Sequence, residues 1–160
     1  MKGVPLHEQG MVILMEIFSN YPLICGIIGW LSAQICKVII GMFHHKKFSF
    51  TLFLSSGGMP SSHTATMLAV TVAIARIHGL ASTYFALAFV VSFIVMYDAA
   101  GVRLQAGKQA AILNKIIKDL EDGETKYMQK DLKELIGHTP VQVFAGAALG
   151  IVIPFLVPVC

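Results

Sequence analysis

The stretch Gly-Gly-Met-Pro-Ser-Ser-His-Thr at residues 57–64 stands directly before an apolar run and combines glycines, hydroxyls and a histidine. Pro60 favours the first position of a helix, and the glycines allow backbone conformations closed to other residues. Ser61, Ser62 and His63 would then lie at a helix N-terminus, whose unpaired N–H groups and partial positive charge favour a phosphate-like anion. A turn with an ordinary Ser or Thr cap fits the same octet. Whether this octet binds an anion or only caps a helix therefore depends on which other residues of the chain lie beside it.

The composition places the chain in a lipid bilayer. Of its 160 residues, 56% are hydrophobic and 13% are charged, and the mean hydropathy is +0.72, which is too apolar for a soluble domain. Four charge-poor stretches, at residues 17–36, 48–75, 77–97 and 139–160, are each long enough to cross the hydrocarbon core as a helix. We therefore expect an all-α, polytopic integral membrane bundle with about four transmembrane helices in a single domain of residues 1–160.

The charge and cysteine content exclude other classes. The net charge of +3 comes without the clustered basic and aromatic residues of a nucleic-acid-binding protein, so no nucleic-acid partner is expected. The three cysteines show no Cys-x-x-Cys spacing, which argues against a disulfide framework or a zinc site.

In chain order, the spans are expected at residues 21–43, 60–75, 82–97 and from 140 onward. Residues 1–16 make a poor signal peptide and are expected to be a retained, poorly defined segment that is interfacial or disordered. Apolar residues recur at helical spacing over 104–120 and again over 128–136, which predicts an amphipathic helical insertion at 104–136 before the last span. The small residues at 146–150 would let another helix approach closely, within the chain or between the two copies of a homodimer.

The distribution of basic residues predicts the orientation. Four spans place both termini on one side of the membrane and the two longer connections on the other. Nine of the twelve Lys and Arg residues fall on that second side: Lys46, Lys47, Arg103, Lys108, Lys115, Lys118, Lys126, Lys130 and Lys133. Because basic loops are retained in the cytoplasm, this side is predicted to be cytoplasmic.

The same topology brings polar residues from all four spans to the cytoplasmic face. They are Lys37, Ser61, Ser62, His63, Asp98, Arg103 and His138. A lysine inside a span is costly without a partner, so Lys37 is read as functional, with snorkelling to the headgroups as the alternative. Asp98 also suits a helix cap, and Arg103 also suits an interfacial anchor. Lysine and arginine clamp phosphate oxygens, and two histidines can divide the roles of nucleophile and general acid in phosphoryl transfer without a metal.

Residues 60–63, Pro-Ser-Ser-His, resemble the Pro-Ser-Gly-His motif of the type 2 phosphatidic acid phosphatases and vanadium haloperoxidases, with Ser62 in place of glycine. The longer stretch at 57–63 has the form found in a small divergent branch of bacteria and plants. Lys37 matches the lysine of that family's first motif, although the Arg-Pro expected after it is missing. The resemblance covers nearly the whole chain from Tyr21 onward.

The third motif of the family consists of Ser-Arg with a later histidine and aspartate, and this chain keeps it only in part. Arg103 and His138 match it if the segment between them is an insertion. The family's closing aspartate, four residues after the histidine, falls on Gln142. Asp98 is the acid near the proposed site that could replace it, so we count it among the catalytic candidates.

The resemblance implies an all-helical fold and a membrane-embedded lipid phosphate phosphatase that needs no metal or other cofactor. His138 would attack phosphorus to form a phosphohistidine, and His63 would protonate the leaving oxygen. The phosphate would be held by Lys37, Gly58, Ser61, Ser62 and Arg103. The substrate would be a phospholipid or isoprenoid lipid phosphate. The charge distribution, and not the resemblance, predicts that it is reached from the cytoplasmic leaflet of a bacterial plasma membrane.

The same residues are also compatible with a protein that is not an enzyme. In the family, the closing aspartate would orient the nucleophilic histidine. A protein that kept the fold and lost this acid could be a non-catalytic lipid-phosphate binder, a scaffold or part of a transport system. The amide at Gln142 favours that interpretation, whereas the retention of both histidines favours an enzyme.

Overall fold

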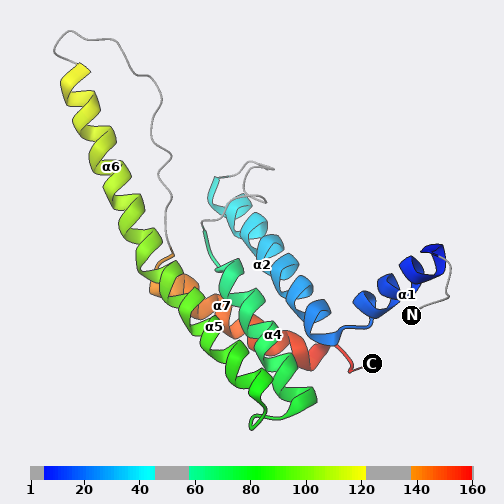
Figure 1. The fold of residues 1–160 in the computed structure, drawn as a ribbon. Coiled ribbons are helices and arrows are strands. Elements are labelled where there is room, and N and C mark those ends of the chain that lie inside the picture. The colour runs from blue at the N-terminus through cyan, green and yellow to red at the C-terminus, as the bar shows by residue number, and fades with distance from the viewer. Residues whose placement is uncertain (1–5, 46–57, 122–137, 160) are drawn as a thin grey trace.

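The computed structural model describes residues 6–45, 58–121 and 138–159, and all regular elements in these ranges are α-helices (Figure 1). They are α1 (Leu6–Phe18), α2 (Tyr21–His45), α4 (Ser62–His78), α5 (Thr83–Ala100), α6 (Val102–Glu121) and α7 (Pro140–Leu156). A helix occupies each position at which the sequence predicts a span.

The described helices confirm an all-α membrane bundle. Two stretches are long and apolar enough to cross a membrane by length and composition, Tyr21–Phe43 and Thr83–Asn114. Helices α4 and α7 have 17 residues each, slightly fewer than the roughly 20 of a complete span. Side chains on α5 such as Leu87, Phe93 and Ile94 are exposed by 66%, 62% and 60%, as expected where the surrounding medium is hydrocarbon.

The bundle is built around α4, which packs against α2, α5 and α7. One face of α4 carries Ala65, Ala69 and Ala73, all completely buried. These residues are four positions apart, so their methyl groups form a single stripe along the helix. A stripe of methyl groups leaves room for a neighbouring helix to come close.

Glycines on the two neighbouring helices complete this close packing. A Cβ atom on Gly29 of α2 would lie 3.0 Å from the carbonyl oxygen of Ala65, and one on Gly150 of α7 would lie 2.5 Å from the same oxygen. A Cβ on Gly146 would collide with the carbonyl oxygen of Ser61. The small residues at 146–150 therefore do allow a close helix approach, as predicted, and the approach is within the chain.

The end of the bundle opposite the N-terminus of α4 is held by a polar cluster. The guanidinium of Arg76 on α4 donates to the hydroxyl of Tyr21 and to the carbonyl of Pro154, and the Tyr21 hydroxyl also donates to that carbonyl. This cluster ties the start of α2 and the ends of α4 and α7 together. Between α4 and α5, the hydroxyls of Thr71 and Ser92 share a hydrogen bond of 2.7 Å.

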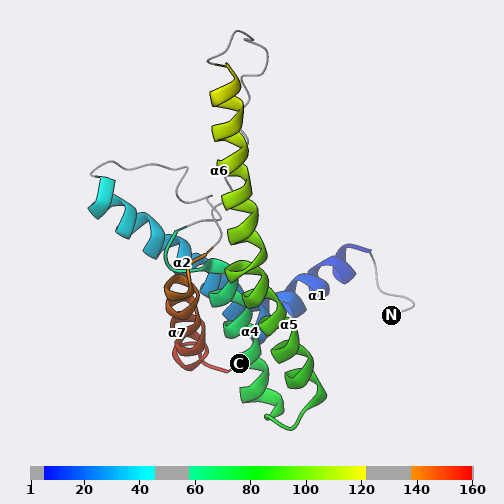
Figure 2. The same cartoon turned by 90° about the vertical axis from the view of Figure 1, so that its left-hand side faces the viewer.

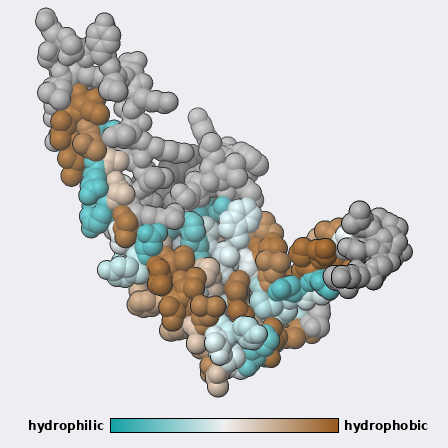
Figure 3. Space-filling view, in the orientation of Figure 1, coloured by the Kyte–Doolittle hydropathy of each residue, from teal (hydrophilic) through white to brown (hydrophobic). Residues whose placement is uncertain are grey.

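Helix α6 continues the course of α5 past Gly101 and projects from the bundle, as both views show (Figure 2). It coincides with the first part of the predicted amphipathic insertion, and the second part, expected at 128–136, lies outside the described residues. The surface view shows hydrophobic side chains over the bundle and hydrophilic ones where α5 passes into α6 (Figure 3).

Helix α1 differs from the sequence-based expectation, which left residues 1–16 poorly defined. The stretch Leu6–Phe18 contains no proline and a single glycine, so nothing in it interrupts a helix. It extends to the side of the bundle in both views.

The close approach of α7 to α4 predicts the effect of adding one methyl group. Gly146→Ala should destabilise the protein by roughly 1–3 kcal/mol, because its Cβ meets backbone that can move only if the helices separate. Gly10→Ala is the matched control, since a Cβ there would have nothing within 4 Å. Thermal unfolding of the purified protein in detergent measures both. An unchanged melting temperature for Gly146→Ala would contradict the packing described here.

Candidate active site

The turn before α4 forms an N-terminal cap, but Pro60 precedes this cap and does not occupy the first helical position that the sequence predicts for it. Ser61 is the N-cap residue, and its Oγ accepts hydrogen bonds from the backbone N–H of Thr64 (3.4 Å) and from the Thr64 hydroxyl (3.1 Å). Gly58, three residues earlier, has a φ of 89°, in the left-handed region that favours glycine. The turn thus directs the positive end of α4 toward the residues described next.

Lys37 reaches this helix end from α2. Its side chain is only 4% exposed, and its Nζ donates a hydrogen bond of 3.2 Å to the Oγ of Ser62. The ammonium therefore lies inside the bundle and does not snorkel to the headgroups. Gly58 lies beside the same side chain, since a Cβ there would be 3.9 Å from the Lys37 Cγ. A buried cation next to a helix N-terminus makes this end of the bundle suited to an anion.

His138 stands immediately before α7 and is 2% exposed. Its backbone N–H donates to the carbonyl of Ala99 at the end of α5, at 3.0 Å. Its ring Nδ1 lies 3.2 Å from the Oε1 of Gln142, an atom that also accepts the backbone N–H of Thr139 at 3.1 Å. Main chain and side chain of His138 are therefore both held.

The rings of His63 and His138 face each other across this end of the bundle. Their centroids are 6.3 Å apart and their planes are inclined by 59°. A nucleophile approaches phosphorus to about 3–3.5 Å, and a general acid approaches the leaving oxygen, one bond beyond phosphorus, to about 3 Å. The two rings therefore lie close enough together to serve the same phosphoryl group.

The structure brings most of the predicted site residues together. Lys37, Ser61, Ser62, His63 and His138 are linked by the contacts above, although they come from two helices and from the segments before α4 and α7. Asp98 is partly buried on α5, directly before the Ala99 that holds His138. Arg103 lies in the first turn of α6, and its side chain is outside the described part of the chain. The catalytic and binding roles of all these residues stay predictions.

The contact between Gln142 and the His138 ring was not predicted from the sequence. There, Gln142 counted only as the position at which the family's aspartate is missing. A signal for it does exist in the sequence. Thr139-x-x-Gln142 is the pattern of a capping box, in which the glutamine side chain turns back to the start of its helix. That return brings the amide to the residue before the cap, which is His138.

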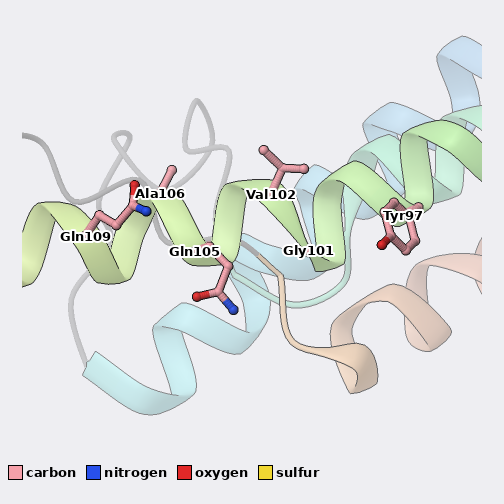
Figure 4. Close-up of a pocket in the computed structure, with 6 residues that line it drawn as sticks. All are labelled: Tyr97, Gly101, Val102, Gln105, Ala106 and Gln109. Atoms are coloured by element: carbon pink, nitrogen blue, oxygen red, sulfur yellow. The ribbon is translucent and has the colours of Figure 1, made fainter.

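A pocket of about 540 Å³ lies elsewhere, along the junction of α5 and α6 (Figure 4). The described residues that line it are Tyr97, Gly101, Val102, Gln105, Ala106 and Gln109. None of them is among the residues of the histidine site.

The fold and the site together define a class: helical membrane proteins in which a helix N-terminus, a buried lysine and two histidines lie together at one end of the bundle. Residues 18–153 match the family described as the Divergent PAP2 family, and the chain belongs to it. It is 40% identical over 149 residues to "Uncharacterized membrane protein YuiD" of Bacillus subtilis (strain 168), an alignment that covers 87% of this chain and 94% of that protein. No solved structure matches the chain.

The buried ammonium predicts a charge-specific effect on anion binding. Lys37→Met keeps the length of the side chain and removes its charge, so the dissociation constant for inorganic phosphate should rise at least about tenfold, the loss of one charge-assisted hydrogen bond. Lys108→Met, which removes an exposed lysine of α6, should leave it unchanged. Titration calorimetry in detergent measures both. Equal effects of the two substitutions would contradict a specific role for Lys37.

Proposed function

We propose that this protein is a membrane-embedded lipid phosphate phosphatase, which hydrolyses a phosphomonoester without a metal through a phosphohistidine intermediate. The observation that carries the proposal is the facing pair of His63 and His138 beside the contact between Lys37 and Ser62. Membership of the Divergent PAP2 family supports it.

In the first step, a ring nitrogen of His138 attacks phosphorus. The bond between phosphorus and the lipid oxygen breaks, and its electron pair leaves with that oxygen, which takes a proton from His63. The Lys37 ammonium and the N–H groups at the start of α4 bind the non-bridging oxygens. They stabilise the negative charge that these oxygens carry in the transition state.

In the second step, water attacks the phosphohistidine. His63, now neutral, takes a proton from the water, and the bond between nitrogen and phosphorus breaks. Inorganic phosphate leaves, and both histidines return to their starting protonation states. The same residue thus serves as acid and then as base.

The site would face the cytoplasm, with both termini on the opposite side of a bacterial plasma membrane. The contacts among α2, α4, α5 and α7 put the histidine site at the end of the bundle from which α6 projects. In the sequence, most of the basic residues fall in the segments between α2 and α4 and between α5 and α7, and basic segments attract anionic headgroups. Its substrates would be phospholipid or isoprenoid lipid phosphates of the inner leaflet.

A second function, non-catalytic lipid-phosphate binding in a scaffold or transport assembly, is favoured by one contact. The atom that faces Nδ1 of His138 belongs to the neutral amide of Gln142 and not to a carboxylate. A neutral partner gives less stabilisation to a positively charged phosphohistidine. Phosphate release from phosphatidic acid in detergent, without added metal, separates this function from the enzyme.

The two histidines should both be required for turnover. His138→Ala and His63→Ala should each abolish phosphate release from phosphatidic acid while the protein stays folded in detergent. Only His138→Ala removes the atom that carries phosphorus, so it should also abolish acid-labile labelling by a ³²P-lipid phosphate. His78→Ala, at the other end of α4, is the matched control and should retain activity. Near-normal turnover in either site variant would refute the assignment.

Single cysteines test the side on which the site lies. In a background with Cys25, Cys36 and Cys160 replaced, Lys46→Cys and Glu121→Cys should resist an impermeant thiol reagent in intact cells. Leu80→Cys, in the turn at the opposite end, should react, because Leu80 is exposed. The reverse pattern would mean that the site faces outward.

A further inference from the structure

We propose that Gln142 is a positioning residue of this site, which sets the tautomer of His138 and ties that ring to the N-terminus of α4. The inference rests on the proposed function in one respect, that His138 is the nucleophile. Its structural basis is a set of three contacts made by the single residue Gln142.

The first two contacts determine which way the amide points. One side-chain atom of Gln142 lies 3.1 Å from the backbone nitrogen of Thr139 and 3.2 Å from Nδ1 of His138. A backbone N–H can only donate, so the atom that faces Thr139 must be the amide oxygen. The ambiguity between oxygen and nitrogen that usually attends a glutamine side chain is removed here.

The orientation of the amide then fixes the proton on the imidazole. An amide oxygen only accepts hydrogen bonds, so Nδ1 of His138 must carry the proton. In a neutral imidazole the other nitrogen, Nε2, then holds the lone pair. Nε2 is therefore the atom that attacks phosphorus, and a ring in the other tautomer would present an N–H there instead.

The third contact joins the histidine to the anion-binding turn. The backbone carbonyl of Gln142 accepts the N–H of Ser61, the N-cap residue of α4, at 3.0 Å. One turn further along α7, Gly146 lies against the carbonyl of the same serine. Gln142 thus holds the nucleophile through its side chain and the phosphate-binding helix end through its main chain.

Two substitutions separate positioning from a merely structural role. Gln142→Leu removes the acceptor, and Gln142→Glu keeps an acceptor of the same length. In the full-length protein in detergent, with dioleoyl phosphatidic acid as substrate, Gln142→Leu should lower kcat about 10²-fold with little change in KM, the scale expected when a reacting group is misplaced. Gln142→Glu should retain at least the wild-type kcat. Gln109→Leu removes an exposed glutamine of α6 and should change neither constant.

A spectroscopic measurement reads the tautomer without relying on turnover. In protein labelled with ¹⁵N-histidine, with His138→Ala used for assignment, the His138 proton should lie on Nδ1 in the wild type and in Gln142→Glu. It should move toward Nε2 in Gln142→Leu. An unchanged tautomer in a folded Gln142→Leu protein, or a wild-type kcat in that variant, would overturn the proposal.

Because the kinetic and the spectroscopic measurements are independent, failure of this inference can be distinguished from failure of the proposed function. A wild-type protein without phosphatase activity defeats the phosphatase proposal, and the tautomer measurement then decides alone whether Gln142 positions the ring. If Gln142→Leu does not fold, Gln142→Glu decides: a proton on Nδ1 supports the role, and a proton on Nε2 overturns it.

Discussion

The close backbone contact of α4 with α2 and α7 is the constraint on which the rest of the structure depends. In hydrocarbon, helices gain little from hiding apolar side chains, and they associate where their surfaces fit closely. Gly29 and Gly150 both approach the same carbonyl of Ala65. The positions of α2 and α7 are thereby fixed relative to α4, and each carries one part of the site, the lysine on α2 and the histidine before α7.

This arrangement explains how charge can be held at one end of an apolar bundle. An ammonium in the bilayer is expensive unless a partner and a route to water are near. The Lys37 ammonium donates to the Ser62 hydroxyl in the first turn of α4. The backbone N–H groups of that turn have no acceptors within the helix. The lysine and the helix end then both favour negative charge at the same place.

Much of the fold and part of the site could be predicted from the sequence, because hydropathy and cap signals are local. The spans near residues 21–43 and 82–97 follow from composition alone, and the Pro-Ser-Ser-His segment marks a helix start. Long-range contacts leave no such mark: periodicity does not reveal that His138 meets the end of α5, or which atom faces its Nδ1. Helix α1 carries neither a long apolar run nor a clear cap signal, so the sequence predicts only an interfacial or disordered segment there.

The polar cluster at Arg76 has a consequence for biosynthesis. Its members Tyr21 and Pro154 are 133 residues apart in the chain, so they cannot meet until the last helix has left the ribosome and entered the membrane. The same is true of Ser61 and Gln142, whose backbone hydrogen bond closes the other end. A nascent chain that ends before α7 thus has Lys37 and His63 already in the bilayer but no companion histidine. Assembly of the site therefore waits for α7, and it coincides with closure of the bundle at both ends.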